Sequence, residues 1–140
     1  MNKQRKVGII GLGHVGAHVA YTLCVRGIAD ELVLVDLNEK KLASEVQDLR
    51  DAVAYHPHRV TIKAGTYEDA ATCDIIVNAA GKIDLLRESL SRVTEMDFTV
   101  PQVRDFCPRL KAAGFKGVFL NITLRSLTFP RGVSLVRARA

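Results

Sequence analysis

The sequence has few cysteines, and they are scattered. Three cysteines, an odd number, lie far apart and form no Cys-x-x-Cys pair, which argues against a disulfide framework and against a zinc site. The four histidines have no ligand spacing with a cysteine or carboxylate cluster. We therefore predict no metal site, and reduced thiols of the kind found in the cytosol.

Long apolar runs, internal repeats and low-complexity segments are also missing. The chain starts with a basic stretch, but the apolar run that follows at residues 7–10 is too short for a secretion signal. No window of the sequence reaches the length of a membrane span. These absences predict a cytoplasmic protein with no membrane partner.

Acidic residues are absent from residues 124–140, and this explains the charge of the whole chain. A net charge of +5 would ordinarily suggest a nucleic-acid partner. However, Arg125, Arg131, Arg137 and Arg139 all fall in this last segment, and the rest of the chain is nearly neutral. We therefore predict no nucleic-acid partner. With 140 residues, 48% of them apolar, the chain is long enough for one domain with a real core.

Short apolar segments alternate with helical periodicity along most of the chain. The expected strands lack an alternation of apolar and polar residues, which is typical of a parallel sheet covered on both faces. This pattern predicts the α/β class, with a doubly wound parallel sheet of the Rossmann type. The expected strands are 6–10, 32–35, 60–62, 74–79 and 117–123, and the expected helices are 14–26, 38–53 and 93–113, the last bent or broken at Pro101 and Pro108.

A Gly-x-Gly-x-x-Gly turn at Gly11, Gly13 and Gly16 follows the first strand directly and opens the first helix. In this context the first glycine allows a tight turn, the second lets the backbone approach a pyrophosphate, and the third lets helix and strand pack closely. Asp36 lies 20 residues further on, at the end of the second strand. A carboxylate there accepts hydrogen bonds from ribose hydroxyls and repels a 2′-phosphate, so NAD is predicted rather than NADP. The alternative is a plain glycine turn with a solvated aspartate.

Several segments resemble the lactate/malate dehydrogenase family in order and spacing, over residues 5–123. Gly65-Thr66-Tyr67-Glu68-Asp69 favours the lactate branch, and Gly81-Lys82-Ile83 together with residues 115–123 is most similar to L-2-hydroxyisocaproate dehydrogenases. The other matching segments are residues 7–16, 34–41 and 75–81.

The resemblance implies a set of cofactor-binding positions. Lys41 is also interpretable as a helix-surface lysine, Tyr67 as a half-buried ring after a turn, and His14 as a surface residue of the glycine turn. Gly81 and Lys82 match the pair that passes the nicotinamide ribose. The full candidate set is Gly11, Gly13, His14, Val15, Gly16, Asp36, Lys41, Tyr67, Gly81 and Lys82.

The polar segment at residues 82–91 resembles the family's substrate loop. By resemblance, Arg92 at its end is the catalytic arginine, which binds substrate and polarises its carbonyl; the alternative is a solvated arginine before a helix. Asp84 falls near the position that selects the substrate side chain, and its charge would repel the second carboxylate of oxaloacetate. This argues against a malate dehydrogenase.

After Thr123 the resemblance stops. The family continues with an Asn-Pro pair, then a catalytic His with its Asp partner and an Arg that binds the substrate carboxylate, whereas here Leu124 and Arg125 follow. We predict an NAD-binding domain over residues 1–123, truncated before the substrate domain, and a poorly packed basic tail over 124–140. The simplest interpretation is a frameshift, because the tail is too short for a sixth strand, its helix and a substrate domain.

These observations favour an NAD-dependent oxidoreductase, an L-lactate or L-2-hydroxyacid dehydrogenase. Its partners would be NAD, a small 2-oxo or 2-hydroxy acid such as pyruvate or 2-oxoisocaproate, and further copies of itself, since the family forms homo-oligomers. As it stands, the chain would be an inactive fragment. The alternatives are a stand-alone NAD-binding module without catalysis and a malate dehydrogenase fragment.

Overall fold

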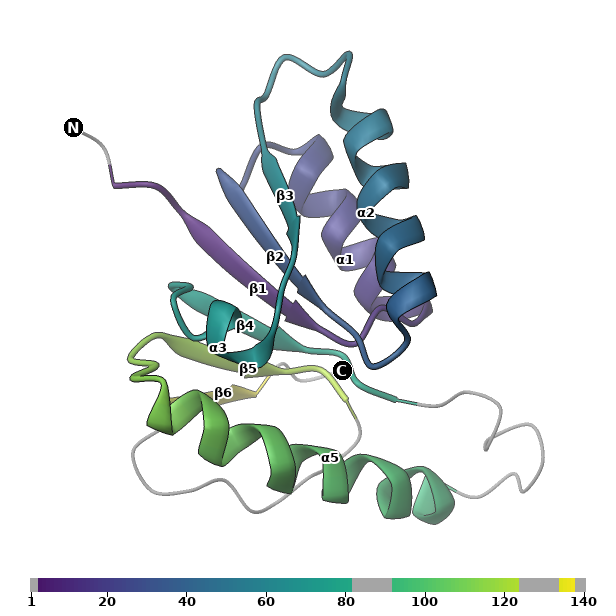
Figure 1. Cartoon of the computed structure of the whole chain (residues 1–140), viewed down its shortest axis with the longest axis vertical. Helices are drawn as coiled ribbons and strands as arrows, with labels where there is room; N and C mark the ends of the chain where they lie inside the picture. Colours follow the sequence, from purple (N-terminus) through teal and green to yellow (C-terminus); the bar gives the residue numbers. More distant parts are fainter. Residues whose placement is uncertain (1–2, 82–91, 124–133, 138–140) are drawn as a thin grey trace.

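A single parallel sheet forms the centre of the computed structural model, which describes residues 3–81, 92–123 and 134–137. The strands lie in the order β3-β2-β1-β4-β5-β6 (Figure 1). This is the strand order of doubly wound dinucleotide-binding sheets, and the predicted fold class is confirmed. The strands are β1 (Lys6–Ile10), β2 (Glu31–Val35), β3 (Thr61–Ala64), β4 (Ile75–Asn78), β5 (Val118–Asn121) and β6 (Ser134–Arg137).

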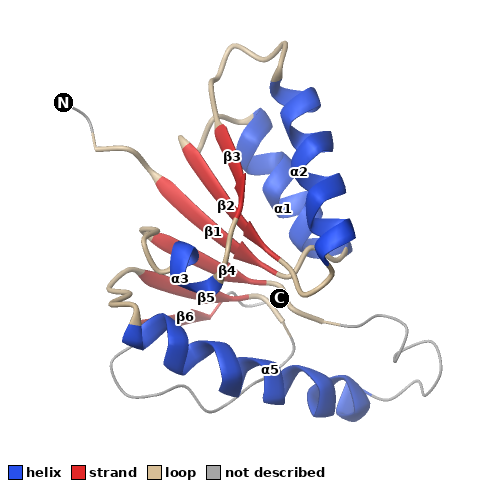
Figure 2. Cartoon of the chain, in the orientation of Figure 1, coloured by secondary structure: helices blue, strands red, loops and turns tan. Residues whose placement is uncertain are grey.

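Helices cover both faces of the sheet (Figure 2). Helices α1 (His14–Val25) and α2 (Glu39–Val53) lie on one face, where Val46 and Leu49 of α2 join Ile9 and Leu34 in one apolar cluster. Helices α3 (Tyr67–Ala70) and α5 (Arg92–Ala112) lie on the other face. There Phe106 packs with Phe119 of β5 and other buried residues. Burial on both faces explains why the strands read as continuous apolar runs.

Local side-chain caps set where two of the helices begin. Asn38 accepts a hydrogen bond from the backbone N–H of Lys41, which satisfies one of the free donors at the start of α2. Thr66 and Asp69 form a reciprocal capping box around the short helix α3. The sequence predicted only a turn at Gly65-Thr66, and α3 was missed because it is a single turn without apolar periodicity.

Helix α5 runs without interruption through Pro101 and Pro108. The predicted helix is confirmed, but the break considered for it does not occur. Each proline removes one backbone donor from the helix. The buried side chains of Val103, Phe106 and Leu110 keep α5 packed along the sheet, so tertiary contacts outweigh that local cost.

The segment after Thr123, which was expected to be too short for a sixth strand, its helix and a substrate domain, does contain a short sixth strand. Residues Ser134–Arg137 form β6 and pair in parallel with β5, with Phe119 opposite Leu135 and Leu120 opposite Val136. A strand is added to an open sheet edge through main-chain hydrogen bonds, which require no apolar periodicity in the added segment. The prediction of a poorly packed tail stays a prediction, because residues 124–133 and 138–140 and the side chains of β6 lie outside the described part of the chain.

Candidate functional site

The glycine turn lies at the carboxyl end of β1, which pairs with β2 on one side and β4 on the other. The chain leaves β1 toward α1 and β2, and β4 begins the other half of the sheet. Ligands of doubly wound sheets bind outside the carboxyl ends of the strands at this change of direction. The backbone N–H of Gly11 donates to the carbonyl oxygen of Val35 at 2.8 Å, which ties the turn to the end of β2.

Two of the three glycines are required by packing within the chain itself. Gly11 has a φ of +88°, and a Cβ there would lie 2.6 Å from the backbone nitrogen of Ala80. A Cβ on Gly16 would lie 1.9 Å from the carbonyl oxygen of Gly11. These contacts allow α1 to approach the end of β1 closely, as predicted for the first and third glycines.

Gly13 differs, because among the described residues nothing beyond its own chain neighbours lies within 4 Å of the place where its Cβ would be. Its φ of −66° is open to any residue, and it precedes α1 without a side-chain cap. The first N–H groups of α1 therefore face a space that no cap occupies, next to exposed His14 and Val15. A helix amino end of this kind attracts anions, and the open cradle fits a pyrophosphate.

The carboxylate of Asp36 borders this cradle and bridges two backbone segments. Its Oδ2 accepts from the N–H of Leu12 at 2.7 Å, and its Oδ1 accepts from the N–H of Asn38 at 2.8 Å. The side chain thus holds the glycine turn against the start of α2, a role that the sequence did not reveal. Each carboxylate oxygen has a further lone pair, so a ribose hydroxyl still has an acceptor there.

A buried amide pair lies at the carboxyl ends of β4 and β5, and sequence reasoning missed it. Asn78 is fully buried, and its Nδ2 donates to Oδ1 of Asn121 at 2.9 Å. The backbone N–H of Ala80 donates to Oδ1 of Asn78 at 3.2 Å, and Thr123 Oγ1 donates to Asn121 at 3.1 Å. A signal existed in the sequence, since each asparagine ends an otherwise apolar strand.

Tyr67 and Lys41 occupy different surroundings. Lys41 is exposed in the first turn of α2. Tyr67 is only 8% exposed and stacks on Phe106 with ring centroids 5.3 Å apart, with the Arg109 guanidinium 4.7 Å from its ring centre. Burial raises the pKa of the Tyr67 hydroxyl, and the charges of Asp105 and Asp36 act in the same direction. Tyr67 is therefore a neutral core residue whose contact with a cofactor stays a prediction.

The remaining candidates surround the segment that follows β4. Gly81 is exposed, three residues after the end of that strand. Lys82 and Asp84 lie outside the described residues. Arg92 is the first residue of α5, which places its backbone at the end of this segment, while its side chain also lies outside the described part.

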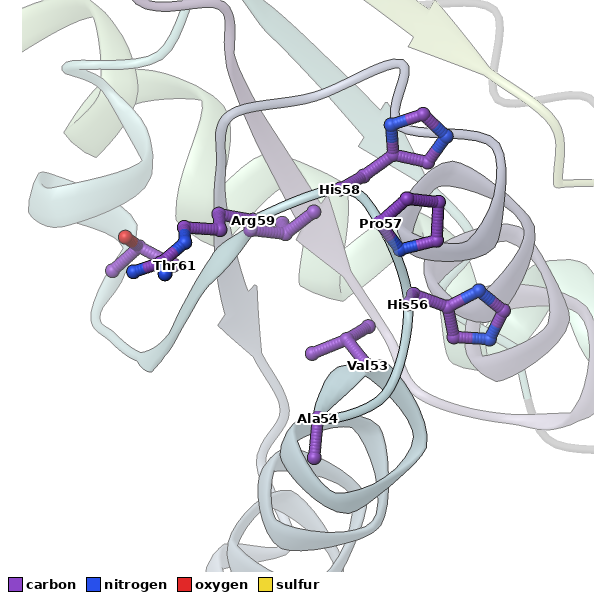
Figure 3. Close-up of a pocket in the computed structure, with 8 residues that line it drawn as sticks. Val53, Ala54, His56, Pro57, His58, Arg59 and Thr61 are labelled. Atoms are coloured by element: carbon purple, nitrogen blue, oxygen red, sulfur yellow. The ribbon is translucent and has the colours of Figure 1, made fainter.

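A surface pocket of about 570 Å³ lies away from the glycine turn, between the end of α2 and the start of β3 (Figure 3). It contains His56, His58 and Arg59, but the arginine extends to one side of the loop and the two rings to the other. The imidazole of His58 instead covers Gly27, where a Cβ would lie 2.4 Å from the ring. These side chains do not converge on one point, so the pocket is not a candidate for binding an anion.

The thiols belong to the core. Cys24, Cys73 and Cys107 are free and buried, and burial raises the pKa of each to about 11. Within the described ranges, no three histidine, cysteine or acidic side chains gather as a metal site would require. In the same part of the chain, none of the helices combines the length and apolar character needed to cross a membrane.

The sequence matches the NAD-binding domain of lactate/malate dehydrogenases over residues 5–123. It is 35% identical to an L-lactate dehydrogenase of Fusobacterium nucleatum, over 88% of this chain and 38% of that protein. It is 36% identical to an L-lactate dehydrogenase of Bacillus velezensis, again over 88% of this chain and 38% of that protein. The chain therefore spans well under half the length of these relatives.

Solved structures show the same likeness. The minor L-lactate dehydrogenase of Enterococcus mundtii, in its ligand-bound form, superposes with a TM-score of 0.76 and 32% identity, over 84% of this chain and 37% of that one. The glycine turn, the aspartate after β2 and the strand order are the features expected of such a domain. The chain belongs to the lactate/malate dehydrogenase family, of which it contains the NAD-binding domain.

Proposed function

We propose that this chain is the cofactor-binding part of an NAD-dependent L-2-hydroxyacid dehydrogenase of the L-lactate type. The observation that carries the proposal is the open cradle at Gly13 beside the carboxylate of Asp36. In the part of the chain that the structure describes, no close neighbour excludes a side chain at Gly13, and its φ suits any residue. A glycine there is explained by a ligand that approaches the backbone.

In this proposal the glycine turn and the amino end of α1 hold the pyrophosphate, and Asp36 accepts from the adenosine ribose. When bound, NAD supplies the hydride acceptor that oxidation of a hydroxyl group requires. Lys41, Tyr67, Gly81 and Lys82 complete the proposed cofactor set. Arg92 is the proposed catalytic residue toward the substrate, and Asp84 the residue that disfavours a second carboxylate, so a lactate-type acid is favoured over malate.

The proposal has three further parts. The substrate is a monocarboxylic 2-oxo or 2-hydroxy acid, copies of the protein assemble into a homo-oligomer, and the protein is located in the cytoplasm. The relatives named L-lactate dehydrogenase support the first. The buried free thiols support a reducing compartment.

The test is a calorimetric titration of the 140-residue chain with NAD and with NADP. We expect NAD to bind more tightly, because the Asp36 carboxylate repels a 2′-phosphate. Asp36→Ala should weaken NAD and reduce the preference, while Asp48→Ala, which removes an exposed charge from the surface of α2, should change neither. Equal or tighter binding of NADP by the unchanged chain would contradict the proposal.

A cofactor-binding module without catalysis is the second candidate. The sequence after Thr123 favours it, since the family's Asn-Pro pair does not follow there. NADH absorbance with L-lactate, L-2-hydroxyisocaproate and L-malate tests whether these 140 residues catalyse any oxidation by themselves. We expect NAD binding without turnover from these 140 residues. Turnover that survives repurification and is lost in Arg92→Ala would assign catalysis to this chain.

A further inference from the structure

We infer that Asn78 and Asn121 are positioning residues, which hold the turn after β4 against the glycine turn and so set the affinity for the nicotinamide half of the dinucleotide. This inference rests on the NAD binding proposed above. The two residues lie opposite each other in the β4–β5 register, at the carboxyl ends of both strands. They are 43 positions apart in the sequence and meet only in the folded sheet.

The hydrogen bonds fix the orientation of the Asn78 amide. A backbone N–H can only donate, so the bond from Ala80 identifies the oxygen side of the amide. The nitrogen side then points to Oδ1 of Asn121, which also accepts from Thr123. Because Asn78 is fully buried, losing either partner would leave a polar group unpaired away from water. The turn over Ala79 and Ala80 is therefore held in one conformation.

This turn forms the wall opposite the first glycine. Ala79 donates its N–H to the carbonyl oxygen of Ile10 at 2.8 Å. The backbone of Ala80 lies so close to Gly11 that a Cβ on Gly11 would approach it to 2.6 Å. A continuous series of contacts thus leads from Asn121, through Asn78 and Ala80, to the glycine turn.

Packing of the sheet does not by itself require a polar side chain at position 78. The preceding residues of β4, Ile76 and Val77, are buried and apolar, and an apolar side chain at position 78 would continue that run. What the amide adds is its bond to Ala80, directly before Gly81. A doubly wound sheet consists of two mononucleotide-binding halves, and the aspartate after the second strand takes the adenosine ribose. Asn78 and Asn121 end β4 and β5, which belong to the other half of the sheet. Loss of the amide pair should therefore affect NAD more than AMP.

The experiment compares Asn78→Leu, Asn121→Leu and Asn121→Asp with the unchanged chain. Calorimetry gives the affinities for NAD and AMP, and hydrogen exchange gives the protection of the Ala80 amide without any ligand. We expect Asn78→Leu to weaken NAD about 10-fold, to change AMP by less than about 2-fold, and to speed exchange at Ala80. Asn121→Asp should retain both affinities, because a carboxylate still accepts from Asn78 and Thr123.

Two controls separate positioning from general stability. Leu49→Ala removes a buried side chain of α2, so it should lower the melting temperature and leave the NAD affinity of the folded chain unchanged. If Asn78→Leu does not fold, Asn121→Leu takes its place, because it keeps the bond to Ala80 and removes only the partner that orients Asn78. We expect a smaller loss of NAD affinity from that variant.

The outcomes for the two proposals are distinct. If the unchanged chain binds no NAD, the proposed function fails and this inference fails with it. If the chain binds NAD but Asn78→Leu and Asn121→Leu bind it equally well, only the inference is overturned. An equal loss of NAD affinity in Leu49→Ala, or an equal loss of AMP and NAD in the asparagine variants, would also overturn it.

Discussion

Substitution by alanine should lower the stability of the chain at Gly16 and its affinity for NAD at Gly13. In Gly16→Ala the new Cβ would lie 1.9 Å from the Gly11 carbonyl oxygen, and a backbone atom cannot move aside as a flexible side chain can. Overpacking of a tight contact costs about 1–3 kcal/mol and occasionally more. Because the required displacement exceeds that of an inserted methylene, we expect the free energy of unfolding to fall by at least about 3 kcal/mol.

Gly13→Ala should leave stability nearly unchanged. Reduced freedom of the unfolded chain stabilises by about 0.4–1 kcal/mol, while alanine is a poorer residue than glycine before a helix by a similar amount. These terms oppose each other, so the net change should stay within about 0.5 kcal/mol. The Cβ would, however, occupy the cradle, and the loss of one hydrogen bond to a charged group should weaken NAD roughly 10- to 100-fold.

Urea unfolding followed by circular dichroism measures the stabilities, and calorimetry measures NAD affinity. Gly114→Ala is the matched control: its surroundings are as open as those of Gly13, but its φ is +84°. It should cost about 1 kcal/mol of stability without changing NAD affinity. The reasoning is refuted if Gly13→Ala binds NAD as tightly as the unchanged chain, or if Gly16→Ala is equally stable.

Three further predictions follow from the core, from an ion pair and from the sheet edge. The Cys24, Cys73 and Cys107 thiols, with pKa values raised to about 11 by burial, should resist a colorimetric thiol reagent at pH 8 until urea unfolds the chain; prompt reaction of the folded chain would contradict this. Hydrogen bonds from Arg5 lower the pKa of Asp30 to about 2, so the contribution of Asp30 to stability is complete above about pH 4 and is lost as the pH falls toward 2. Asp30→Asn should flatten the acid side of a stability–pH profile, and an unchanged slope would argue against the ion pair. Ending the chain at Thr123 removes β6 and opens the edge of β5, so we expect a lower melting temperature and self-association in sedimentation; no change in either would mean that β6 contributes nothing.

The parts of the fold that rest on neighbours in sequence could be predicted from the residues alone. The expected strand at residues 6–10 coincides with β1, and the helix expected at 38–53 begins one residue later, after its Asn38 cap. The strand, glycine turn, helix and Asp36 together indicated the family. Apolar runs, caps and glycine spacing act over a few residues, so they can be read before the chain folds.

The parts that depend on distant segments could not be predicted in this way. The assignment of Tyr67 to the cofactor stays a prediction, but the contacts of its ring with Phe106 and Arg109 of α5 could not be foreseen from the sequence. The strand β6 arises from the open edge of β5, not from any pattern in residues 134–137. In both cases the deciding contact joins segments that the sequence keeps far apart.

By itself, the sequence determined that this protein carries a glycine turn between a buried strand and a helix, with an aspartate at the end of the next strand. Only the tertiary structure decided what each of these residues does. In the folded chain there is space for a Cβ at Gly13 but none at Gly16, which lies against the carbonyl oxygen of Gly11. Folding also brings Asn78 within hydrogen-bonding distance of Asn121. The physical reason is that free space and buried hydrogen bonds depend on contacts between segments that are distant in the sequence, and these contacts form only when the sheet assembles.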